Sequence, residues 1–294
     1  MDTDHPDLFL SKNLEIHVVD HCNLDCVGCS HGSPFMKPRL EDPVRLERSI
    51  GVLWKYYRTS LIKLLGGEPL LHPGIDKIIK AVKDTTGARV RLVTNGTLLE
   101  RRYKFLEGID EIHISKYREA KIPSDEEIRE IACYLGCEVT VQAFNYFRWE
   151  HSEPRNDLKL TERIFNTCQL FHSWQCHTLR DGWFYGCPPI ATRSTEISEG
   201  VPLLNEDLEV GEKIWDLLTR KKPFDCCKLC LGSVGTRFEH HTGWKKRTGE
   251  QVVGGIDMVF LHQLEGNPDL YNGCYTYERM FLPSGKVVLL KGGC

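Results

Sequence analysis

The alternation of strand-like and helix-like segments over residues 14–142 constrains the fold of this chain more than any other feature. Short apolar runs alternate with longer runs in which apolar residues recur every three or four positions. Five such repeats predict parallel strands joined by helices, in a sheet that closes fully or partly into a barrel. The predicted strands are 14–19, 61–65, 89–93, 111–114 and 138–142, and the predicted helices are 42–57, 75–83, 98–106 and 124–135.

The pattern changes after about residue 146, and the polar stretch 147–157 is a candidate linker. We therefore expect an α/β fold. It consists of a partial parallel (β/α) barrel over residues 1–155, a small cysteine-rich α+β domain over 156–240 and a C-terminal cap over 241–294. Further expected elements are a β-hairpin over 176–187 that turns at Asp181-Gly182, a helix over 209–219, and in the cap the apolar run 258–261 and the strand-like run 287–290.

Composition limits the setting in which the chain works. Of its 294 residues, 41% are hydrophobic and 27% are charged, and the formal net charge of −3 gives no reason to expect a nucleic-acid partner. The N-terminal stretch lacks the pattern of a signal peptide, and no run approaches the ~18 apolar residues of a membrane helix. We therefore expect a cytoplasmic protein with no membrane partner. Thirteen cysteines in a reducing compartment indicate metal or redox chemistry rather than disulfides.

Three cysteines follow the first predicted strand directly. Cys22, Cys26 and Cys29 have the spacing C-x₃-C-x₂-C, and the next cysteine is Cys133. The loop falls at the C-terminal ends of the strands, where α/β sheets carry their active sites. Structural zinc and iron–sulfur sites normally take four protein ligands. Three thiolates on a cubane cluster leave one iron free for another ligand, which indicates a catalytic site, with a structural zinc site as the alternative.

This spacing resembles the signature of the radical S-adenosylmethionine (radical SAM) superfamily. The resemblance implies that Cys22, Cys26 and Cys29 hold a [4Fe–4S] cluster whose fourth iron binds the amino and carboxylate groups of S-adenosylmethionine. It also implies that one electron, supplied by a reductant such as flavodoxin or ferredoxin, cleaves the sulfonium C–S bond. The resulting 5′-deoxyadenosyl radical then takes a hydrogen atom from the substrate.

Other marks of the superfamily follow the later strands. Gly66-Gly67-Glu68-Pro69 matches the GGEP motif, whose backbone and carboxylate hold the amino group of the cofactor. The resemblance also implies cofactor contacts at the ends of the next three strands, namely Thr94, Asn95, Ser115 and Gln142. The sequence departs from the family in two ways. Leu24 stands where an aromatic residue is frequent, and five strands are clear where six are common, so the sixth either lies within 145–149 or is altered.

A second group of cysteines resembles the Twitch and SPASM extensions of radical SAM enzymes, which carry auxiliary [4Fe–4S] clusters. Only Cys274 and Cys294 follow Cys230, so a single auxiliary cluster of the Twitch type fits better. The expected ligands are Cys187, Cys227 and Cys230, with Cys168 or Cys176 as the fourth. Counting from the hairpin turn places Cys176 opposite Cys187. Cys226 can replace Cys227, and a zinc ribbon of the same thiols is the alternative.

Radical chemistry suits unactivated C–H bonds, whose protons no side-chain base can remove. The cluster loop resembles members that act on sugars and aminocyclitols, so we expect a small sugar-like substrate and a natural-product (antibiotic) pathway. The reaction is either epimerisation, slightly favoured by Cys274 and Cys294 as spare hydrogen donors, or alcohol dehydrogenation with the auxiliary cluster as electron acceptor.

Two other functions compete with this expectation. One is modification of a ribosomal peptide, although about a dozen residues before the first strand leave no room for a leader-binding domain. The other is a non-enzymatic metal-binding interaction protein, which has no use for a GGEP loop. Asp20 and His31 flank the cluster loop and either contact cluster or substrate or cap the loop, while surface or packing roles are expected for His240 and His241.

Overall fold

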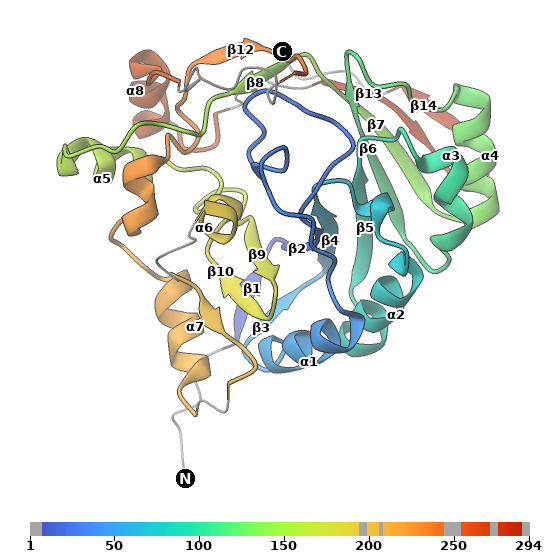
Figure 1. Cartoon of the computed structure of the whole chain (residues 1–294), viewed down its shortest axis with the longest axis horizontal. Coiled ribbons are helices and arrows are strands. Elements are labelled where there is room, and N and C mark those ends of the chain that lie inside the picture. The colour runs from blue at the N-terminus through green and yellow to red at the C-terminus, as the bar shows by residue number, and fades with distance from the viewer. Residues whose placement is uncertain (1–7, 194–198, 206–207, 244–253, 271–275, 290–294) are drawn as a thin grey trace.

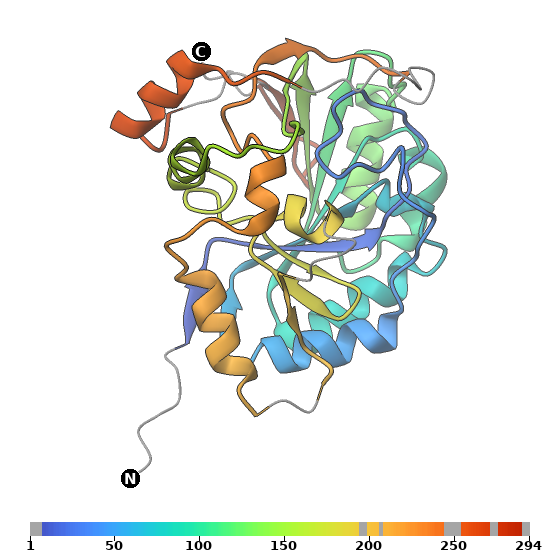
Figure 2. The ribbon, with the colours of Figure 1, turned by 60° about the vertical axis from the view of Figure 1, so that its left-hand side comes forward.

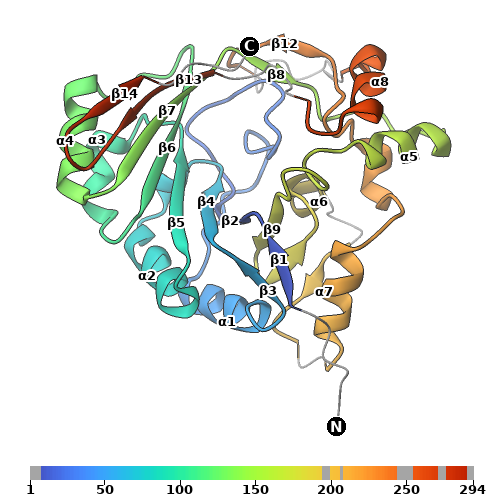
Figure 3. The same cartoon turned by 180° about the vertical axis from the view of Figure 1, so that it is seen from behind.

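A ten-stranded sheet forms the centre of the protein (Figure 1). The computed structural model describes residues 8–193, 199–205, 208–243, 254–270 and 276–289. The strand order is β11-β10-β9-β2-β4-β5-β6-β7-β13-β14. Seen from behind, the order from β13 through β7, β6, β5 and β4 to β2 can be followed directly (Figure 3).

Five neighbouring strands of the parallel part of the sheet confirm the predicted repeats. They are β2 (Leu14–Val19), β4 (Leu61–Gly66), β5 (Arg89–Thr94), β6 (Glu111–Tyr117) and β7 (Glu138–Phe144). The connecting helices are α1 (Pro43–Leu53), α2 (Ile75–Thr86), α3 (Leu99–Arg102) and α4 (Asp125–Leu135). The predicted α/β class, with a largely parallel central sheet, is therefore confirmed.

Local sequence signals explain where the helices begin and end. The Asp42 side chain caps the start of α1 and accepts a hydrogen bond from the Arg45 amide. Ser124 and Glu127 form a reciprocal capping box on α4, which ends at Gly136 with φ 64°. Two predicted helices are shorter than expected. α1 ends before β3 (Tyr57–Thr59), which pairs with β1 (Phe9–Ser11), and α3 passes at residue 103 into a 3₁₀ turn.

The sixth barrel strand is altered. The stretch 145–149 contains β8 (Tyr146–Arg148), which leaves the central sheet and pairs with β12 (Arg237–Glu239). The place beside β7 is taken instead by β13 (Thr276–Phe281), which runs antiparallel to it. β13 pairs in turn with β14 (Val287–Leu289), inside the expected strand-like run, whose residue 290 lies outside the described residues.

The second half of the chain extends the same sheet at its other edge. β9 (His177–Arg180) pairs in parallel with β2 and in antiparallel with β10 (Trp183–Tyr185), which in turn pairs with β11 (Val201–Pro202). The hairpin turns at Asp181 and Gly182, both with positive φ, as predicted. The sheet therefore runs across residue 155, where we predicted a boundary, and the division into three domains stays a prediction.

Four further helices accompany these strands. They are α5 (Leu158–Asn166), α6 (Pro188–Arg193), α7 (Val210–Leu218) and α8 (Met258–Gly266). α7 and α8 coincide with the predicted helix at 209–219 and the predicted apolar run at 258–261. In Figure 2 these four helices range in colour from the olive green of α5 to the red-orange of α8. None of the helices in the described part of the chain combines the length and apolar character needed to span a bilayer.

His177 on β9 makes stability depend on pH. Its side chain is buried, and its Nδ1 lies 3.0 Å from the Tyr57 hydroxyl. Burial lowers the pKa of His177 to about 3. The unfolded chain binds a proton below about pH 6.5, and the folded protein does so only near pH 3, so stability falls as pH decreases through this window. At pH 5 the loss from this group is about 2 kcal/mol.

We therefore expect His177→Gln to lose less stability than the parent chain between pH 7.5 and 5. The difference, about 2 kcal/mol, is measured by urea unfolding of the reduced apoprotein at both pH values. His262→Gln, the same substitution at an exposed histidine on α8, is the matched control. If stability depends on pH equally in the parent chain and in His177→Gln, then His177 is not the source of the pH-dependent loss.

Candidate active site

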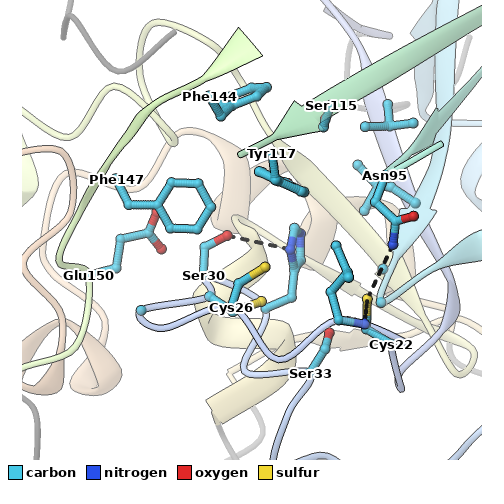
Figure 4. A pocket seen from close by; sticks show the side chains of 18 of the residues that line it. Cys22, Cys26, Ser30, Ser33, Asn95, Ser115, Tyr117, Phe144, Phe147 and Glu150 are labelled. Atoms are coloured by element: carbon cyan, nitrogen blue, oxygen red, sulfur yellow. Dashed lines mark hydrogen bonds between the residues drawn. The ribbon is translucent and has the colours of Figure 1, made fainter. Parts of the chain in front are cut away.

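A cavity of about 330 Å³ lies at the C-terminal ends of β4, β5 and β6. One side is formed by the three-cysteine loop that follows β2, and another by β8 and the residues after it. Figure 4 shows Cys22 and Asn95 on one side of the cavity, with Phe147 and Glu150 on the other. Buried cavities at this edge are the usual ligand sites of parallel sheets.

All three loop cysteines line this cavity. The Asn95 amide Nδ2 lies 3.7 Å from the Cys22 sulfur, which also accepts the Leu24 amide at 3.4 Å. Burial raises the pKa of all three thiols, and that of Cys22 rises to about 12. Such thiols stay protonated until a metal replaces the proton, because metal ligation requires the thiolate. The donor set of three soft thiols at one cavity wall therefore suits an iron–sulfur cluster.

The cysteine loop is fixed at both ends. At its start, the buried Asp20 carboxylate receives two hydrogen bonds each from Arg39 and Arg180, at 2.7–3.1 Å. Further along, the Val27 amide donates to the His241 carbonyl, and Cys26 forms an isolated bridge with Thr242. Of the two roles considered for Asp20, the structure shows the loop-capping one. Arg39 and Arg180 are partners that the sequence did not indicate.

The GGEP loop packs directly against the start of the cysteine loop. The Gly67 amide donates to the Val19 carbonyl at 2.6 Å, and the Glu68 amide donates to the His21 carbonyl at 3.1 Å. A Cβ on Gly67 would lie 1.9 Å from the His21 carbonyl oxygen, so only glycine fits. The backbone of Gly66 and Gly67 is therefore brought to the cavity wall beside the cysteines.

The Glu68 carboxylate is turned toward the end of β5 and the backbone of its own loop. It accepts the Thr94 hydroxyl at 2.6 Å, the Asn95 amide at 2.8 Å and the Leu70 amide at 3.0 Å. Burial raises its pKa to about 7, while these three donors act in the opposite direction. Glu68 thus ties the GGEP loop to the end of β5, and it is not among the residues that line the cavity.

The structure brings some predicted cofactor contacts to the cavity and leaves others behind its wall. Thr94, Asn95 and Ser115 line it with Gly66 and Gly67, whereas Glu68, Pro69 and Gln142 do not. Gln142 is buried on β7 and faces His113 of β6. The cofactor contacts expected at Glu68, Pro69 and Gln142 therefore stay predictions, and in this structure these three side chains are buried.

Five cysteines of the second group line another, smaller cavity. They are Cys168, Cys187, Cys226, Cys227 and Cys230. Burial raises the pKa of Cys168, Cys187 and Cys230. A hydrogen bond between the neighbouring thiols of Cys226 and Cys227 lowers the pKa of Cys227 and raises that of Cys226. We call this cavity the thiol site. It offers one donor more than a four-ligand cluster needs.

Cys176 lies elsewhere. The hairpin register is the one expected, with Tyr185 opposite Thr178, but pairing ends there and α6 begins at residue 188. Cys176 is buried against Glu15 of β2 and is not among the residues of the thiol site. The structure thus favours Cys168 over Cys176 as the fourth ligand, since the fold carries the Cys176 side chain toward the sheet.

The cavity and the thiol site share a wall made of Leu170 and Gly232, which line both. Gly232 has φ +52°, and a Cβ there would lie 3.2 Å from the Cys168 sulfur. The sequence did not indicate this proximity, because residues 170 and 232 are far apart along the chain. The cavity and the thiol site are therefore neighbours that have Leu170 and Gly232 in common.

Several lining residues were missed in the sequence. They are Tyr117, Phe144, Phe147, Glu150, Leu170, Trp174, Gly232 and Ser233. Tyr117 could have been found from the two-residue period of a strand, because it follows Ser115 by two positions on β6. Glu150 and Trp174 follow no such period, since they come from irregular segments after β8 and α5.

The remaining candidates are outside this site. Cys274 and Cys294 lie outside the described residues. His240 is buried behind the cavity, where its ring stacks on Tyr117 at 4.7 Å between centroids, in agreement with a packing role. Within the described residues, no three Cys, His, Asp or Glu side chains converge closely enough to hold a single metal ion.

Comparison with known proteins finds a family likeness in the N-terminal part of the chain. Residues 16–137 match the family model described as "Radical SAM superfamily". A protein named "Probable GTP 3′,8-cyclase" from Methanococcus aeolicus is 34% identical over 113 residues, which are 35% of this chain and 36% of that protein. The chain thus spans about a third of the length of this curated relative.

Solved structures resemble the chain more extensively but at lower identity. BtrN in complex with AdoMet and 2-DOIA is 17% identical, with a TM-score of 0.46, over 76% of this chain and 94% of that one. Native anSMEcpe with bound AdoMet is 13% identical, with a TM-score of 0.49, over 88% of this chain and 96% of that one. The family match covers β2 through the end of α4, together with the cysteine loop and the GGEP loop. Over residues 16–137 the chain is therefore similar to radical SAM domains, and the cofactors that this likeness supports are S-adenosylmethionine and a [4Fe–4S] cluster.

Proposed function

We propose that this protein is a radical SAM enzyme that removes a hydrogen atom from a C–H bond of a small carbohydrate-like substrate, an aminosugar or aminocyclitol. The observation that carries the proposal is the cavity itself, in which the three-cysteine loop and the glycine backbone of the GGEP loop face aromatic and polar side chains. When bound, the cluster and S-adenosylmethionine supply a radical able to attack an unactivated C–H bond. The chain supplies the binding surfaces.

The lining of the cavity supports a polyol-like substrate. Tyr117, Phe144, Phe147 and Trp174 offer aromatic faces that suit the C–H faces of a saturated ring. Ser30, Ser115, Ser233, His31 and Glu150 offer hydrogen-bonding groups that suit hydroxyl or amino substituents. Arg148 is the one permanently charged cation among the described lining residues, and it pairs with Asp257 at 3.0 Å. A neutral or weakly cationic substrate therefore fits better than a polyanion.

Between the two reactions, the described residues favour alcohol dehydrogenation. Among them, the loop cysteines are the only thiols that line the cavity, so a thiol donor for epimerisation would have to come from Cys274 or Cys294. Dehydrogenation needs an electron acceptor close to the substrate. The thiol site behind Leu170 and Gly232, filled by an auxiliary [4Fe–4S] cluster on Cys168, Cys187, Cys227 and Cys230, is well placed for that role.

The named relatives supply a second candidate. Proteins called GTP 3′,8-cyclase share about a third of this chain, which raises radical cyclisation of a nucleotide as an alternative. The described lining offers a triphosphate little charge complementarity, because Arg148 is already paired. GTP therefore belongs among the test substrates. Modification of a ribosomal peptide is the remaining alternative.

The test is an anaerobic incubation of the reconstituted, dithionite-reduced protein with S-adenosylmethionine in D₂O. The substrates are D-glucosamine, myo-inositol, streptamine and GTP, and the products are identified by mass. We expect 5′-deoxyadenosine and a sugar-type product that has lost two hydrogens. A gain of one deuterium would instead indicate epimerisation. A cyclised nucleotide would replace the proposal by the cyclase reaction, and no product from any of the four would direct the search to peptides.

Matched cysteine variants control this experiment. Cys26→Ala removes a loop thiol at the cavity and should reduce 5′-deoxyadenosine formation to background. Cys133→Ala changes an exposed cysteine outside both sites and should behave like the parent protein. Unchanged turnover by Cys26→Ala would refute the assignment of the cluster loop.

A further inference from the structure

Arg193, the last residue of α6, lies between the cavity and the thiol site. Its Nη1 donates to the Glu150 carbonyl at 2.9 Å, and its Nη2 lies 3.6 Å from Oε2 of the Glu150 carboxylate. Only 11% of the Arg193 side chain is exposed. Because α6 starts directly after Cys187, the helix reaches from one site to the other. Arg193 therefore holds a segment of the cavity wall.

The same guanidinium lies beside the thiol site. Cys230 is next to it, and the neighbouring Leu231 amide donates to the Glu150 carbonyl at 3.0 Å. A second arginine, Arg155, is engaged differently, since its Nη2 donates to the carbonyl oxygens of Cys227 and Cys230. Arg193 is thus the buried cation that faces both a thiol and a carboxylate.

Glu150 faces the cavity with unused hydrogen-bonding capacity. Its carboxylate lines the cavity, and Oε2 has no hydrogen-bond partner among the described residues (Figure 4). Burial raises the pKa of Glu150 to about 7, while the charge of Arg193 acts to lower it. Arg193 Nη2 is 3.6 Å from Oε2, beyond hydrogen-bond distance, so the acceptor still gains from a donor that a ligand or water supplies. A hydroxyl or amino group of a substrate is such a donor.

We propose that Arg193 is a positioning residue shared by the two sites: it holds Glu150 as the anchor for a substrate hydroxyl or amino group and balances charge at the thiol site. This inference rests on the proposed auxiliary cluster. Charges separated by a few ångströms in a poorly solvated region interact strongly, so a change of charge at one site alters the electrostatic energy at the other. Binding a polar substrate at Glu150 and adding an electron at the thiol site are thereby coupled.

The test is a reduction-potential measurement that needs no substrate. The auxiliary cluster is titrated in the reconstituted protein and followed by electron paramagnetic resonance. In Arg193→Gln we expect a more negative potential, because removal of the cation makes an added electron less favourable. The expected change is at least tenfold in the reduction equilibrium, or about 59 mV for a one-electron couple. Arg193→Lys keeps the charge and should largely restore the parent potential.

Two further variants make the result specific. Arg220→Gln removes an exposed cation that lies over the Phe224 ring near the same site, and it should shift the potential much less. Glu150→Gln removes the opposing charge and should shift the potential in the positive direction. Equal shifts in Arg193→Gln and Arg220→Gln, or an unchanged potential in Glu150→Gln, would overturn the inference.

Failure of the underlying function gives a different result. If the parent protein takes up only four iron atoms, and cysteine variants at the thiol site do not change that number, then no auxiliary cluster exists. The proposed cluster and the inference then fail together. If two clusters are present and Arg193→Gln leaves the second potential where it was, the inference fails alone.

Discussion

Gly67→Ala is expected to abolish S-adenosylmethionine binding and to destabilise the fold by about 3 kcal/mol. A Cβ on residue 67 would lie 1.9 Å from the His21 carbonyl oxygen and 3.0 Å from that of Asp20. Both neighbours are backbone atoms, so they cannot yield by a change of rotamer. The GGEP loop and the cysteine loop would have to separate, and the cavity wall would be lost. Calorimetric titration with S-adenosylmethionine and urea unfolding measure the two effects.

Gly51→Ala is the matched control. Gly51 is in α1, and a Cβ there meets nothing closer than a Thr85 methyl at 4.0 Å. Alanine in a helix interior is more favourable than glycine by about 1 kcal/mol, so this variant should be slightly more stable and bind normally. Normal S-adenosylmethionine affinity in Gly67→Ala would show that the contact between the loops is dispensable.

Asp20→Asn is expected to cost about 3 kcal/mol, because it leaves two partly buried guanidinium groups, whose side chains are 18% and 19% exposed, without the carboxylate that they share. Asp20 is 4% exposed and accepts four hydrogen bonds from Arg39 and Arg180. These residues come from the cysteine loop and the β9–β10 hairpin, so the substitution loosens the loop that holds the cluster. We expect reduced iron content after reconstitution as well as a lower urea midpoint.

The pKa of Asp20 determines how the stability contribution of its carboxylate changes with pH. Burial acts to raise that pKa, but the hydrogen bonds from Arg180 and Arg39 lower it below the usual value of 3.8. A lowered carboxyl pKa means that the stabilisation is present above about pH 4 and is lost as pH falls further. The parent chain should therefore lose this contribution in acid, whereas Asp20→Asn has none to lose. Asp84→Asn, which breaks an exposed pair with Lys80, should change stability little.

Periodicity predicted the elements whose burial is one-sided or complete. The strand at 14–19 is buried at every position, and in strand 89–94 buried residues alternate with more exposed ones. Both patterns could be recognised from the spacing of apolar residues in the sequence. The edge of the sheet was not predictable in the same way. β13 joins β7 from more than a hundred residues away, and no local signal distinguishes it from any other short apolar strand.

The residues of the site can likewise be divided into those that the sequence predicted and those that it did not. Cys22, Cys26 and Cys29 and the GGEP glycines lie in compact motifs, which the sequence shows directly. Glu150 and Arg193 became visible only in three dimensions, since their roles depend on which loops meet. The choice between Cys168 and Cys176 was open for the same reason. The predicted hairpin register was right, but α6 begins directly after Cys187. Cys168, and not Cys176, lines the thiol site together with Cys187.

The two outer strands that flank the parallel core have a consequence for biosynthesis. β2 and β7 are the outer members of the five predicted parallel strands, and their outer partners, β9 (parallel) and β13 (antiparallel), are encoded after residue 155. During translation, the outer edge of β2 has no strand to pair with until β9 is synthesised. The outer edge of β7 has none until β13, which begins at residue 276, is synthesised. A strand edge left open during translation is a template for aggregation. Yield of the folded protein should therefore depend on elongation speed and on chaperones that shield the edge of β7.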